Sequence, residues 1–476
     1  MSSLKSTLIG AFSLLAIQRA AATRAPRPKV TTDVLIIGGG AGGAHAAVQL
    51  TDAGKKVIVI EKQADLGGSV DSYDDPVTGV KSELGVAAWS NYGNTTGFFD
   101  RLNVPYWSGD FFQTPFKFYD FSTGELLTNY TSPAQEVQLA AWQRYINATK
   151  PYQDFHIPGF FNFPNSSEIP EELLMPFGEF VEKYDLAATL QEIFYISPGL
   201  GTVVDQLTLT VLQAFPAFLA ESYAGQRASY GPRSGRSQDV YDAAAKILGD
   251  KVYYSTEAVS TVRSNKGVTV VVKNSVTGEK TTIAASKLLL AIPPHPSLFK
   301  TFDMDKKEAN VLSKFSYARL WAAVAQSDSL PSDFYAFNLP SSANDNSYLH
   351  YPALNFTSTY IPFGNTSKLV ATVTAGDDKL DAAETLKLFN QDIAALSGTG
   401  VVPASDKDVE VIHYSDHGLL HGHATAEDIK NGFFQNLNAL QGYRSTWYTG
   451  NTFSAPVQTA VWAHNDQEII PRILAA

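Results

Sequence analysis

The chain has 476 residues, of which 44% are hydrophobic and 17% are charged. This composition excludes a disordered chain, because it supplies enough apolar surface to bury a large core in two or three domains. The formal net charge of −11 leaves no basic surface that could neutralise phosphates, so nucleic acid is excluded as a partner. The absence of cysteine excludes disulfides, thiolate catalysis and iron–sulfur clusters.

The N-terminus has the pattern of a secretory signal peptide over residues 1–22. Lys5 precedes an apolar run over residues 8–17, and the small residues 20–22 follow. The alternative is a membrane anchor, but the run has about half of the ~20 apolar residues needed to cross a bilayer. We therefore expect cleavage near Ala22, no stable membrane span, and a mature protein that is secreted or kept in the secretory-pathway lumen.

Sequons for N-glycosylation agree with passage along that route. The six N-x-S/T sites lie at Asn94, Asn129, Asn147, Asn165, Asn355 and Asn365. Some sequons occur by chance, so these sites support the predicted signal peptide without proving it.

A βαβ unit is predicted where the fold begins, at Thr32. The aliphatic run Val34–Ile37 predicts a parallel strand buried on both faces. Residues Ala41–Asp52 are predicted to form a helix, and Lys56–Ile60 a second buried strand. This order places a glycine-rich turn between a strand and the start of a helix.

That turn satisfies the pattern G-x-G-x-x-G with Gly38, Gly40 and Gly43. Gly38 allows the tight turn, Gly40 lets a pyrophosphate approach the backbone at the helix N-terminus, and Gly43 lets helix and strand pack closely. Glu61 follows the second strand, where an acidic side chain accepts bonds from a ribose diol. An acid there disfavours NADP, and NAD and FAD remain. The complete βαβ context disfavours a glycine turn without a ligand.

A second glycine pair separates these two cofactors. Gly67 and Gly68, followed by Ser69, come six residues after Glu61 and resemble a stretch of the flavin-containing amine oxidases and their relatives. The resemblance implies that this stretch approaches the pyrophosphate and flavin of FAD. Relatives often have Arg at the position of Ser69, so this chain departs from the family pattern there.

Two later stretches resemble the same superfamily. The resemblance implies that the backbone at Val259 meets the adenine ring. It also implies that Gly450 and Asn451, with a helix that begins near Gln458, lie against the flavin pyrimidine, where a positive helix end stabilises reduced flavin. Relatives often have Glu where this chain has Asn451.

Within the superfamily, the C-terminus resembles the fungal flavoenzymes grouped with β-cyclopiazonate dehydrogenase. The resemblance lies in Leu440–Gly450 and in Val461 and Trp462. It implies oxidation of a small molecule, apolar or aromatic, in secondary metabolism, by dehydrogenation or oxidative cyclisation with hydride transfer to flavin N5. FAD is expected to be noncovalent, since a cysteinyl link is excluded, and secretion away from cytosolic NAD favours O2 as electron acceptor.

The order of patterns predicts an α/β fold with a Rossmann-type, GR2-like FAD-binding domain in three discontinuous segments and an inserted α+β substrate domain. Helices are predicted over Ala134–Ala148 and Pro170–Tyr184, within an aromatic-rich cap. The predicted FAD segments are 30–104, 221–299 and 439–476, and the predicted cap or substrate segments are 105–220 and 300–438.

The later part of the chain is rich in strand patterns. Strands are predicted over Val252–Val262, Val268–Lys273 and Thr281–Ile292. A last strand over Trp447–Gly450 and a closing helix over Val457–Leu474 are predicted at the C-terminus.

Catalytic side chains are marked only weakly, because in flavin oxidation few protein groups react themselves. Trp447, Tyr448 and Trp462 lie near the expected flavin, and one of them is a candidate for the substrate cavity wall, with core packing as the alternative. Lys314 is a candidate for a lysine that holds a water at flavin N5, with a solvated lysine as the alternative.

Four histidines, His413, His417, His421 and His423, lie close together. Zinc sites normally combine such spacing with a defined helix or with acid and thiol ligands, and Gly418 and Gly422 interrupt any helix here. We therefore expect a loop near the substrate domain and no metal site. Asp416 beside His417 suggests a hydrolytic triad, but no G-x-S-x-G elbow completes it.

Two further functions fit this superfamily. The first is an FAD-dependent double-bond isomerase of polyunsaturated fatty acids or polyenes, favoured by the apolar, aromatic-rich cap. The second is a non-catalytic binding protein on the same fold, similar to the GDP-dissociation inhibitors.

Overall fold

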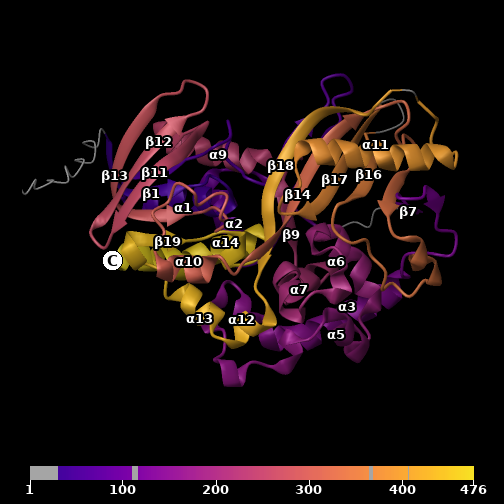
Figure 1. Cartoon of the computed structure of the whole chain (residues 1–476), viewed down its shortest axis with the longest axis horizontal. Coiled ribbons are helices and arrows are strands. Elements are labelled where there is room, and N and C mark those ends of the chain that lie inside the picture. Colours follow the sequence, from indigo (N-terminus) through magenta and orange to yellow (C-terminus); the bar gives the residue numbers. More distant parts are fainter. Residues whose placement is uncertain (1–29, 110–115, 364–367, 406) are drawn as a thin grey trace, which may run out of the picture.

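Two large β-sheets, side by side, organise the chain (Figure 1). The computed structural model describes residues 30–109, 116–363, 368–405 and 407–476. The predicted signal peptide and Asn365 lie outside these described residues. Within them, no helix combines the length and the apolar character that a membrane crossing requires.

The first sheet contains strands from three distant parts of the chain. β1 (Val30–Ile37) lies between β2 (Val57–Ile60) and β13 (Lys280–Leu290), and both pairings are parallel. β10 (Val252–Tyr253) extends the sheet beyond β2, and β19 (Thr446–Tyr448) runs parallel to β13. This sheet unites parts of the chain that lie within the three predicted FAD segments.

An antiparallel meander completes this sheet. β11 (Thr256–Ser264) pairs with β12 (Gly267–Asn274), which pairs with β13. The predicted strand over 252–262 is therefore wrong as a single element. Ser255, in the left-handed region at φ 49°, separates β10 from β11, and the two strands pair with different neighbours.

The aliphatic runs of the first sheet are buried on both faces, as predicted. Leu35 and Ile37 belong to one hydrophobic cluster, whereas Val34 and Ile36 belong to another. Successive side chains of a strand point to opposite faces, so each half of the run supplies a different core. A continuous apolar run is therefore required here.

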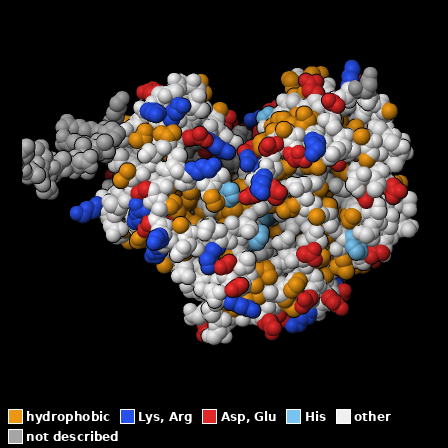
Figure 2. Space-filling model, in the orientation of Figure 1, with side chains coloured by type: hydrophobic (Ala, Val, Ile, Leu, Met, Phe, Trp, Pro, Cys, Tyr) orange, Lys and Arg blue, Asp and Glu red, His pale blue; other side chains and the backbone are white. Residues whose placement is uncertain are grey.

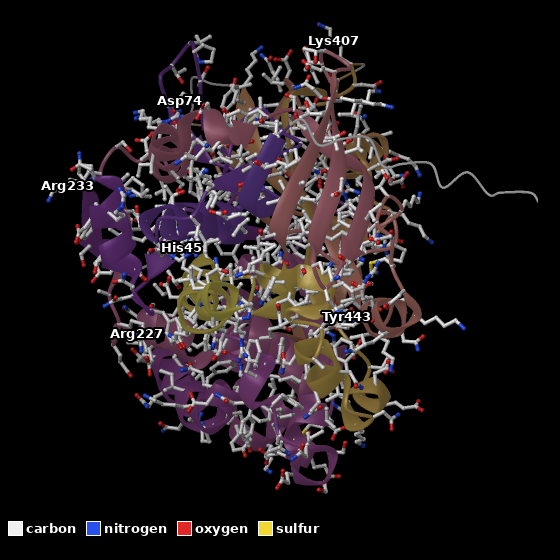
Figure 3. All side chains as sticks on the ribbon, turned by 90° about the vertical axis from the view of Figure 1, so that its left-hand side faces the viewer. His45, Asp74, Arg227, Arg233, Lys407 and Tyr443 are labelled. Carbon is white, nitrogen blue, oxygen red and sulfur yellow. The ribbon has the colours of Figure 1, made fainter. Side chains whose placement is uncertain are left out.

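Helices cover one face of this sheet. α1 (Ala41–Asp52), α9 (Gln238–Leu248) and α14 (Gln458–His464) supply residues to the same hydrophobic cluster. Figure 3 shows His45 of α1 beside the yellow C-terminal helices, and its ring stacks on that of Trp462 with centroids 5.8 Å apart. The predicted closing helix is wrong as one element, because a π-helical turn (Asn465–Ile469) separates α14 from α15 (Ile470–Ala475).

The second sheet is mostly antiparallel and has the order β18-β14-β17-β16-β15-β7-β8. Its strands are β7 (Phe116–Asp120), β8 (Glu125–Leu126), β14 (Ser316–Gln326), β15 (Tyr335–Asn338), β16 (Phe356–Pro362), β17 (Leu369–Asp377) and β18 (Glu410–His423). α11 (Ala382–Gly398) lies across its outer face, where Phe389 and Ile393 pack against Tyr360 (Figure 1). The opposite face is directed toward the helical cap.

The cap is a group of helices below the second sheet (Figure 1). It contains α3 (Gln135–Thr149), α5 (Phe177–Tyr184), α6 (Leu190–Ile196), α7 (Thr208–Ala214) and α8 (Ala217–Tyr223). The predicted helix over 170–184 is shorter than expected. A 3-10 turn over Glu171–Leu174 precedes Pro176, and α5 begins only after this proline, which has no backbone N–H to continue a helix.

Shorter elements join these layers. The short strands are β3 (Ser72–Asp74), β4 (Lys81–Glu83), β5 (Trp89–Ser90), β6 (Tyr106–Gly109) and β9 (Ser229–Pro232). The short helices are α2 (Thr95–Leu102), α4 (Gln153–His156), α10 (Lys306–Leu312), α12 (Ala426–Lys430) and α13 (Phe433–Asn438).

Candidate cofactor and active site

Residues of both sheets and of the cap line one cavity of about 880 Å³. Figure 2 shows the surface hollowed between the two lobes, with charged side chains of both signs around the notch. One charged group of the cavity wall joins the lobes: Asp416 of β18 pairs with Arg319 at 2.8 Å and with Lys62 at 3.7 Å. The cavity therefore lies where the first sheet meets the second.

The glycine turn after β1 has the geometry that its sequence pattern predicts. Gly38 is in the left-handed region at φ 101°, and an added Cβ would lie 2.6 Å from the carbonyl oxygen of Ala291. At Gly43 a Cβ would lie 1.8 Å from the carbonyl oxygen of Gly38, so only glycine lets α1 pack this closely on β1. Gly40 lies between them in the cavity wall.

Glu61 is buried at the end of β2, with 5% of its surface exposed, and lines the same cavity. Its Oε2 accepts a hydrogen bond from the Gly39 N–H at 2.6 Å, and its Oε1 accepts one from the Gln63 N–H at 2.8 Å. Each carboxylate oxygen has a second lone pair, so the side chain is oriented by the backbone and still able to accept hydroxyl donors.

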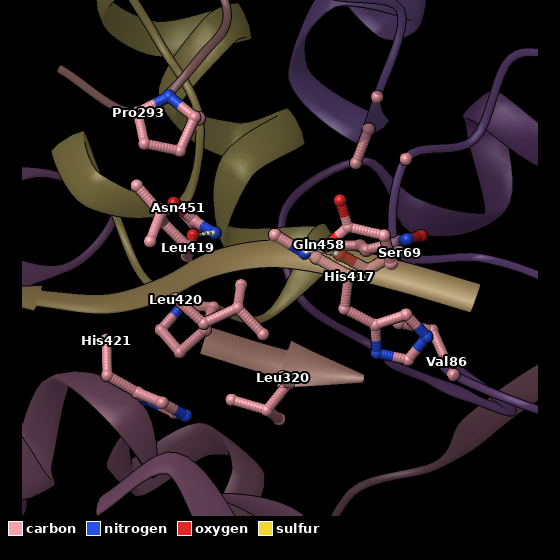
Figure 4. Close-up of a pocket in the computed structure, with 18 of the residues that line it drawn as sticks. Ser69, Val86, Pro293, Leu320, His417, Leu419, Leu420, His421, Asn451 and Gln458 are labelled. Carbon is pink, nitrogen blue, oxygen red and sulfur yellow. Dashed lines mark hydrogen bonds between the residues drawn. The ribbon is translucent and has the colours of Figure 1, made fainter. Parts of the chain in front are cut away.

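The second glycine pair lies against the first turn. The N–H of Gly67 donates to the carbonyl of Gly39 at 3.1 Å, and a Cβ on Gly68 would lie 3.0 Å from the Cα of Gly40. Ser69 lines the cavity next to this pair, and its hydroxyl donates to the carbonyl of His417 at 3.3 Å (Figure 4). The stretch therefore connects the glycine turn to β18.

The C-terminal residues Gly450, Asn451 and Gln458 also line the cavity. Gln458 is the first residue of α14, and its Oε1 accepts hydrogen bonds from Trp89 Nε1 at 2.7 Å and from the Tyr241 hydroxyl at 2.8 Å. Figure 4 shows Asn451 and Gln458 among the residues that line this cavity. The structure thus brings the N-terminal and C-terminal predicted site residues to one cavity.

At the predicted adenine position, the cavity wall is formed by Thr256, Glu257 and Ala258. Val259 is the next residue, at a β-bulge between Ala258 and Ser260, and does not belong to the wall. The bulge adds one residue to the strand and thereby shifts the side-chain alternation, which the sequence pattern does not show.

The weak catalytic candidates do not reach the cavity wall. Trp447 and Tyr448 lie on β19, which pairs with β13; Trp447 packs in the hydrophobic cluster of α1 and Tyr448 in the cluster on the opposite face. Lys314 pairs with Asp428 at 2.6 Å, and Trp462 stacks on His45. None of the four lines the cavity of the described residues, because core packing and a surface ion pair take up these side chains.

The far end of the cavity is largely apolar. Its wall includes Tyr195 of α6, Leu320 of β14, Phe337 of β15 and Val373 of β17. Glu192 of α6 is a charged exception, and burial raises the pKa of its carboxyl. Sequence analysis did not identify these residues, because they come from the cap and the second sheet and share no local motif.

The prediction that the four histidines lie on a loop is wrong. They lie on β18, the longest strand of the second sheet. The error has a physical reason: Gly418, at φ 73°, lies where the register with β14 shifts, so the glycines accompany bulges in a strand. His417 and His421 line the cavity, whereas His413 Nε2 pairs with Asp71 at 2.6 Å. Among the residues described, no group of His, Asp or Glu has the arrangement of a metal site.

Comparisons with known proteins agree with this geometry. Residues 36–102 match the family model described as an NAD(P)-binding Rossmann-like domain. The chain is 32% identical over 456 residues to the FAD-dependent oxidoreductase dpasF of Apiospora sacchari, covering 93% of each chain. It is 30% identical over 450 residues to β-cyclopiazonate dehydrogenase of Aspergillus oryzae, again covering 93% of each.

Solved structures show the same fold. A fatty acid isomerase from P. acnes that produces CLA superposes with a TM-score of 0.67 at 18% identity, over 93% of this chain and 98% of the isomerase. Putrescine oxidase superposes with a TM-score of 0.59 at 16% identity, over 94% of this chain and all of the oxidase. The predicted fold class, a Rossmann-type FAD-binding domain with α/β sheets, is confirmed.

The predicted family and enzyme class are confirmed as well, because relatives that are 32% and 31% identical to this chain are named FAD-dependent oxidoreductases, and a third is named as a dehydrogenase. The glycine turn, the buried acid Glu61 and the C-terminal residues Gly450, Asn451 and Gln458 line one cavity. The chain belongs to the family of fungal FAD-dependent oxidoreductases that includes β-cyclopiazonate dehydrogenase.

Proposed function

We propose that the enzyme holds FAD noncovalently in this cavity and oxidises a small apolar or aromatic molecule of secondary metabolism by dehydrogenation or oxidative cyclisation. The observation that carries the proposal is that one cavity joins the glycine turn to an apolar pocket under the second sheet. The relatives named after β-cyclopiazonate support the dehydrogenation. The oxidoreductase family argues against the non-catalytic binding protein as an alternative.

The residues of the first sheet fit a dinucleotide. Gly40 and Gly42 leave the backbone at the start of α1 open to the cavity, where N–H groups attract a pyrophosphate. Glu61 offers lone pairs for ribose hydroxyls, and Gly68 and Gly450, which pack against Gly40 and Gly42, add no side chains to the cavity wall there. No cysteine is available for a thioether link to the flavin, which supports noncovalent binding.

When bound, FAD supplies a hydride acceptor at flavin N5. The chain supplies the surroundings. Leu320, Leu419 and Phe337 exclude water from the far end, which strengthens every polar contact made there. Arg319 and Asp416 form an ion pair in the cavity wall, and they hold β14 and β18 together there.

We further propose O2 as the electron acceptor and the secretory pathway as the location. The predicted signal peptide supports both, because the secretory lumen is separated from cytosolic NAD pools. The sequons at Asn94, Asn129, Asn147, Asn165 and Asn355 are exposed, as glycosylation requires. Edman sequencing and glycosidase treatment of protein secreted from a fungal host test this part, and an uncleaved N-terminus would contradict it.

A flavin-dependent isomerase is the second candidate, favoured by the apolar pocket and by the fold shared with the fatty acid isomerase. The two candidates differ in the electron balance. An oxidoreductase removes two hydrogen atoms from its substrate and leaves reduced flavin in the absence of O2. An isomerase yields a product of unchanged mass and oxidised flavin.

The deciding experiment uses the metabolite that accumulates when the gene is deleted. Purified holoenzyme is mixed with it anaerobically, the flavin absorbance is followed, and the product mass is measured. Bleaching of the flavin with loss of two hydrogens supports the oxidoreductase. Conversion at unchanged mass, without bleaching, would refute it in favour of the isomerase.

A further inference from the structure

His421 has a backbone conformation that needs an explanation. β18 and β14 pair at Ser316 with His423 and at Ala318 with Leu420, so two residues of β18, His421 and Gly422, face the single residue between. His421 has φ 53°, in the left-handed region that residues other than glycine rarely adopt. Bulges of this kind redirect side chains and are frequent beside active sites.

The bulge directs the imidazole into the cavity wall on the side of the cap (Figure 4). The ring is 7% exposed and packs beside Leu320 and Gly199, where a Cβ on Gly199 would lie 2.6 Å from His421 Cδ2. The surroundings are thus apolar. His421 belongs to the end of the cavity opposite the glycine turn.

The imidazole of His421 has no partner in the described part of the chain. Nδ1 is enclosed and makes no hydrogen bond, and no described residue bonds Nε2, which is not enclosed. Two other histidines of β18 have partners, because His413 bonds Asp71 and His423 Nδ1 lies 2.8 Å from the His421 carbonyl oxygen. His417, which also lines the cavity, has an enclosed Nε2 without a hydrogen bond, but its backbone φ is not in the left-handed region. A buried polar side chain without any partner is destabilising, because its hydrogen bonds with water are lost and not replaced.

The enclosed nitrogen indicates the tautomer. Buried N–H groups without an acceptor are rarer than buried acceptors without a donor, so Nδ1 carries the lone pair and Nε2 carries the proton. Burial lowers the pKa of His421 to about 4, which keeps the ring neutral near pH 7. A neutral Nε2–H at the cavity surface needs an oxygen acceptor.

We propose that His421 is a substrate-binding residue whose Nε2–H donates a hydrogen bond to a carbonyl or enol oxygen of an otherwise apolar substrate. This inference rests on the proposed function, since it names the substrate class of the same cavity. The hydrogen bond would fix which end of the substrate lies under the second sheet. Leu320 and the apolar wall would hold the rest of the molecule.

The test compares two probes of similar shape, 1-tetralone, which has a carbonyl oxygen, and tetralin, which has none. Their dissociation constants are measured by calorimetry on purified holoenzyme. In the wild type the hydrogen bond from His421 favours the ketone and so changes the ratio of the two dissociation constants. In His421→Phe this hydrogen bond is absent. We expect His421→Phe to shift the ratio about tenfold against the ketone, the effect of one such bond.

Two variants control this result. His421→Gln keeps an N–H donor and should restore part of the preference for the ketone. His350→Phe changes a half-buried histidine that pairs with Asp345 and does not line the cavity, and should leave the ratio unchanged. Thermal unfolding of each variant is measured to check that it is folded.

A ratio that is the same in His421→Phe and in the wild type would overturn the proposal. Failure of the wild type to bind either probe would overturn it as well. Flavin absorbance of the same samples tests the proposed function separately. If the wild type retains flavin but His421→Phe leaves the ratio unchanged, only the inference about His421 is wrong. If the wild type holds no flavin, the proposed function itself is wrong.

Discussion

Gly43→Ala tests whether the contact between α1 and β1 controls cofactor binding. The added Cβ would lie 1.8 Å from the carbonyl oxygen of Gly38 and 3.0 Å from its carbonyl carbon. These are backbone atoms that cannot rotate away. Because a packed interior leaves no room for this overlap, α1 must move away from β1 by more than about 1 Å. Overpacking of this kind costs about 1–3 kcal/mol of folding stability.

The same movement should weaken FAD binding, because Gly40 and Gly42 at the start of α1 line the cavity. A loss of about 1.4 kcal/mol in contacts with the pyrophosphate corresponds to a tenfold larger dissociation constant for FAD. The assay is reconstitution of apoprotein with FAD, followed by flavin fluorescence, together with thermal unfolding of the apoprotein. We expect at least tenfold weaker binding and a lower unfolding temperature.

Gly398→Ala is the matched control. Gly398 ends α11, and an added Cβ there has no atom within 4 Å. The substitution should leave FAD binding unchanged and stabilise the helix by up to about 1 kcal/mol. Wild-type stability and FAD affinity in Gly43→Ala would refute the account of the glycine turn.

Three further substitutions test other parts of the structure. Glu61→Gln should weaken FAD binding about tenfold in the same reconstitution assay, because one side-chain oxygen that accepts a backbone N–H is lost; unchanged affinity would contradict the role of Glu61. Burial raises the pKa of the Asp392 carboxyl to about 7, whereas in the unfolded chain this carboxyl ionises near pH 4. Between these two pH values the folded state binds more protons than the unfolded state. The free energy of unfolding therefore falls by up to about 4 kcal/mol as the pH rises. Denaturant unfolding should therefore show Asp392→Asn more stable than the wild type at pH 8 and similar near pH 4, whereas parallel pH profiles would contradict the raised pKa. Glu308→Gln removes one of the two carboxylates that pair with the buried Arg263, the one at 2.6 Å, while Asp303 stays at 2.8 Å. It should lower the free energy of unfolding by about 1.5–3 kcal/mol in urea titrations; a loss below about 1 kcal/mol would show that the pair is dispensable.

The parts of the site that the sequence predicted are those fixed by local geometry. Gly43 and Glu61 make their contacts within one βαβ unit, with the Gly38 carbonyl and the Gly39 N–H, so their spacing in the sequence is enough to predict their roles. The burial of alternate residues of β1 in two clusters follows in the same way from a continuous apolar run. These features require no knowledge of the rest of the chain.

The parts that the sequence did not predict depend on distant pairing. The histidines of β18 are placed by its register with β14, and a bulge decides that His421 enters the cavity. At the bulge between Ala258 and Ser260, Ala258 lines the cavity and Val259 does not. Because strand register and bulges are decided between strands far apart in the chain, no local pattern of glycine and histidine reveals them.

Binding of FAD in the cavity is the central claim, and the visible absorption spectrum of the purified protein tests it most directly. The protein is measured before and after acid precipitation, which releases a noncovalent cofactor. We predict a flavin spectrum that moves completely into the supernatant. A colourless protein that does not take up added FAD would contradict the account, and a flavin that stays with the precipitate would contradict noncovalent binding.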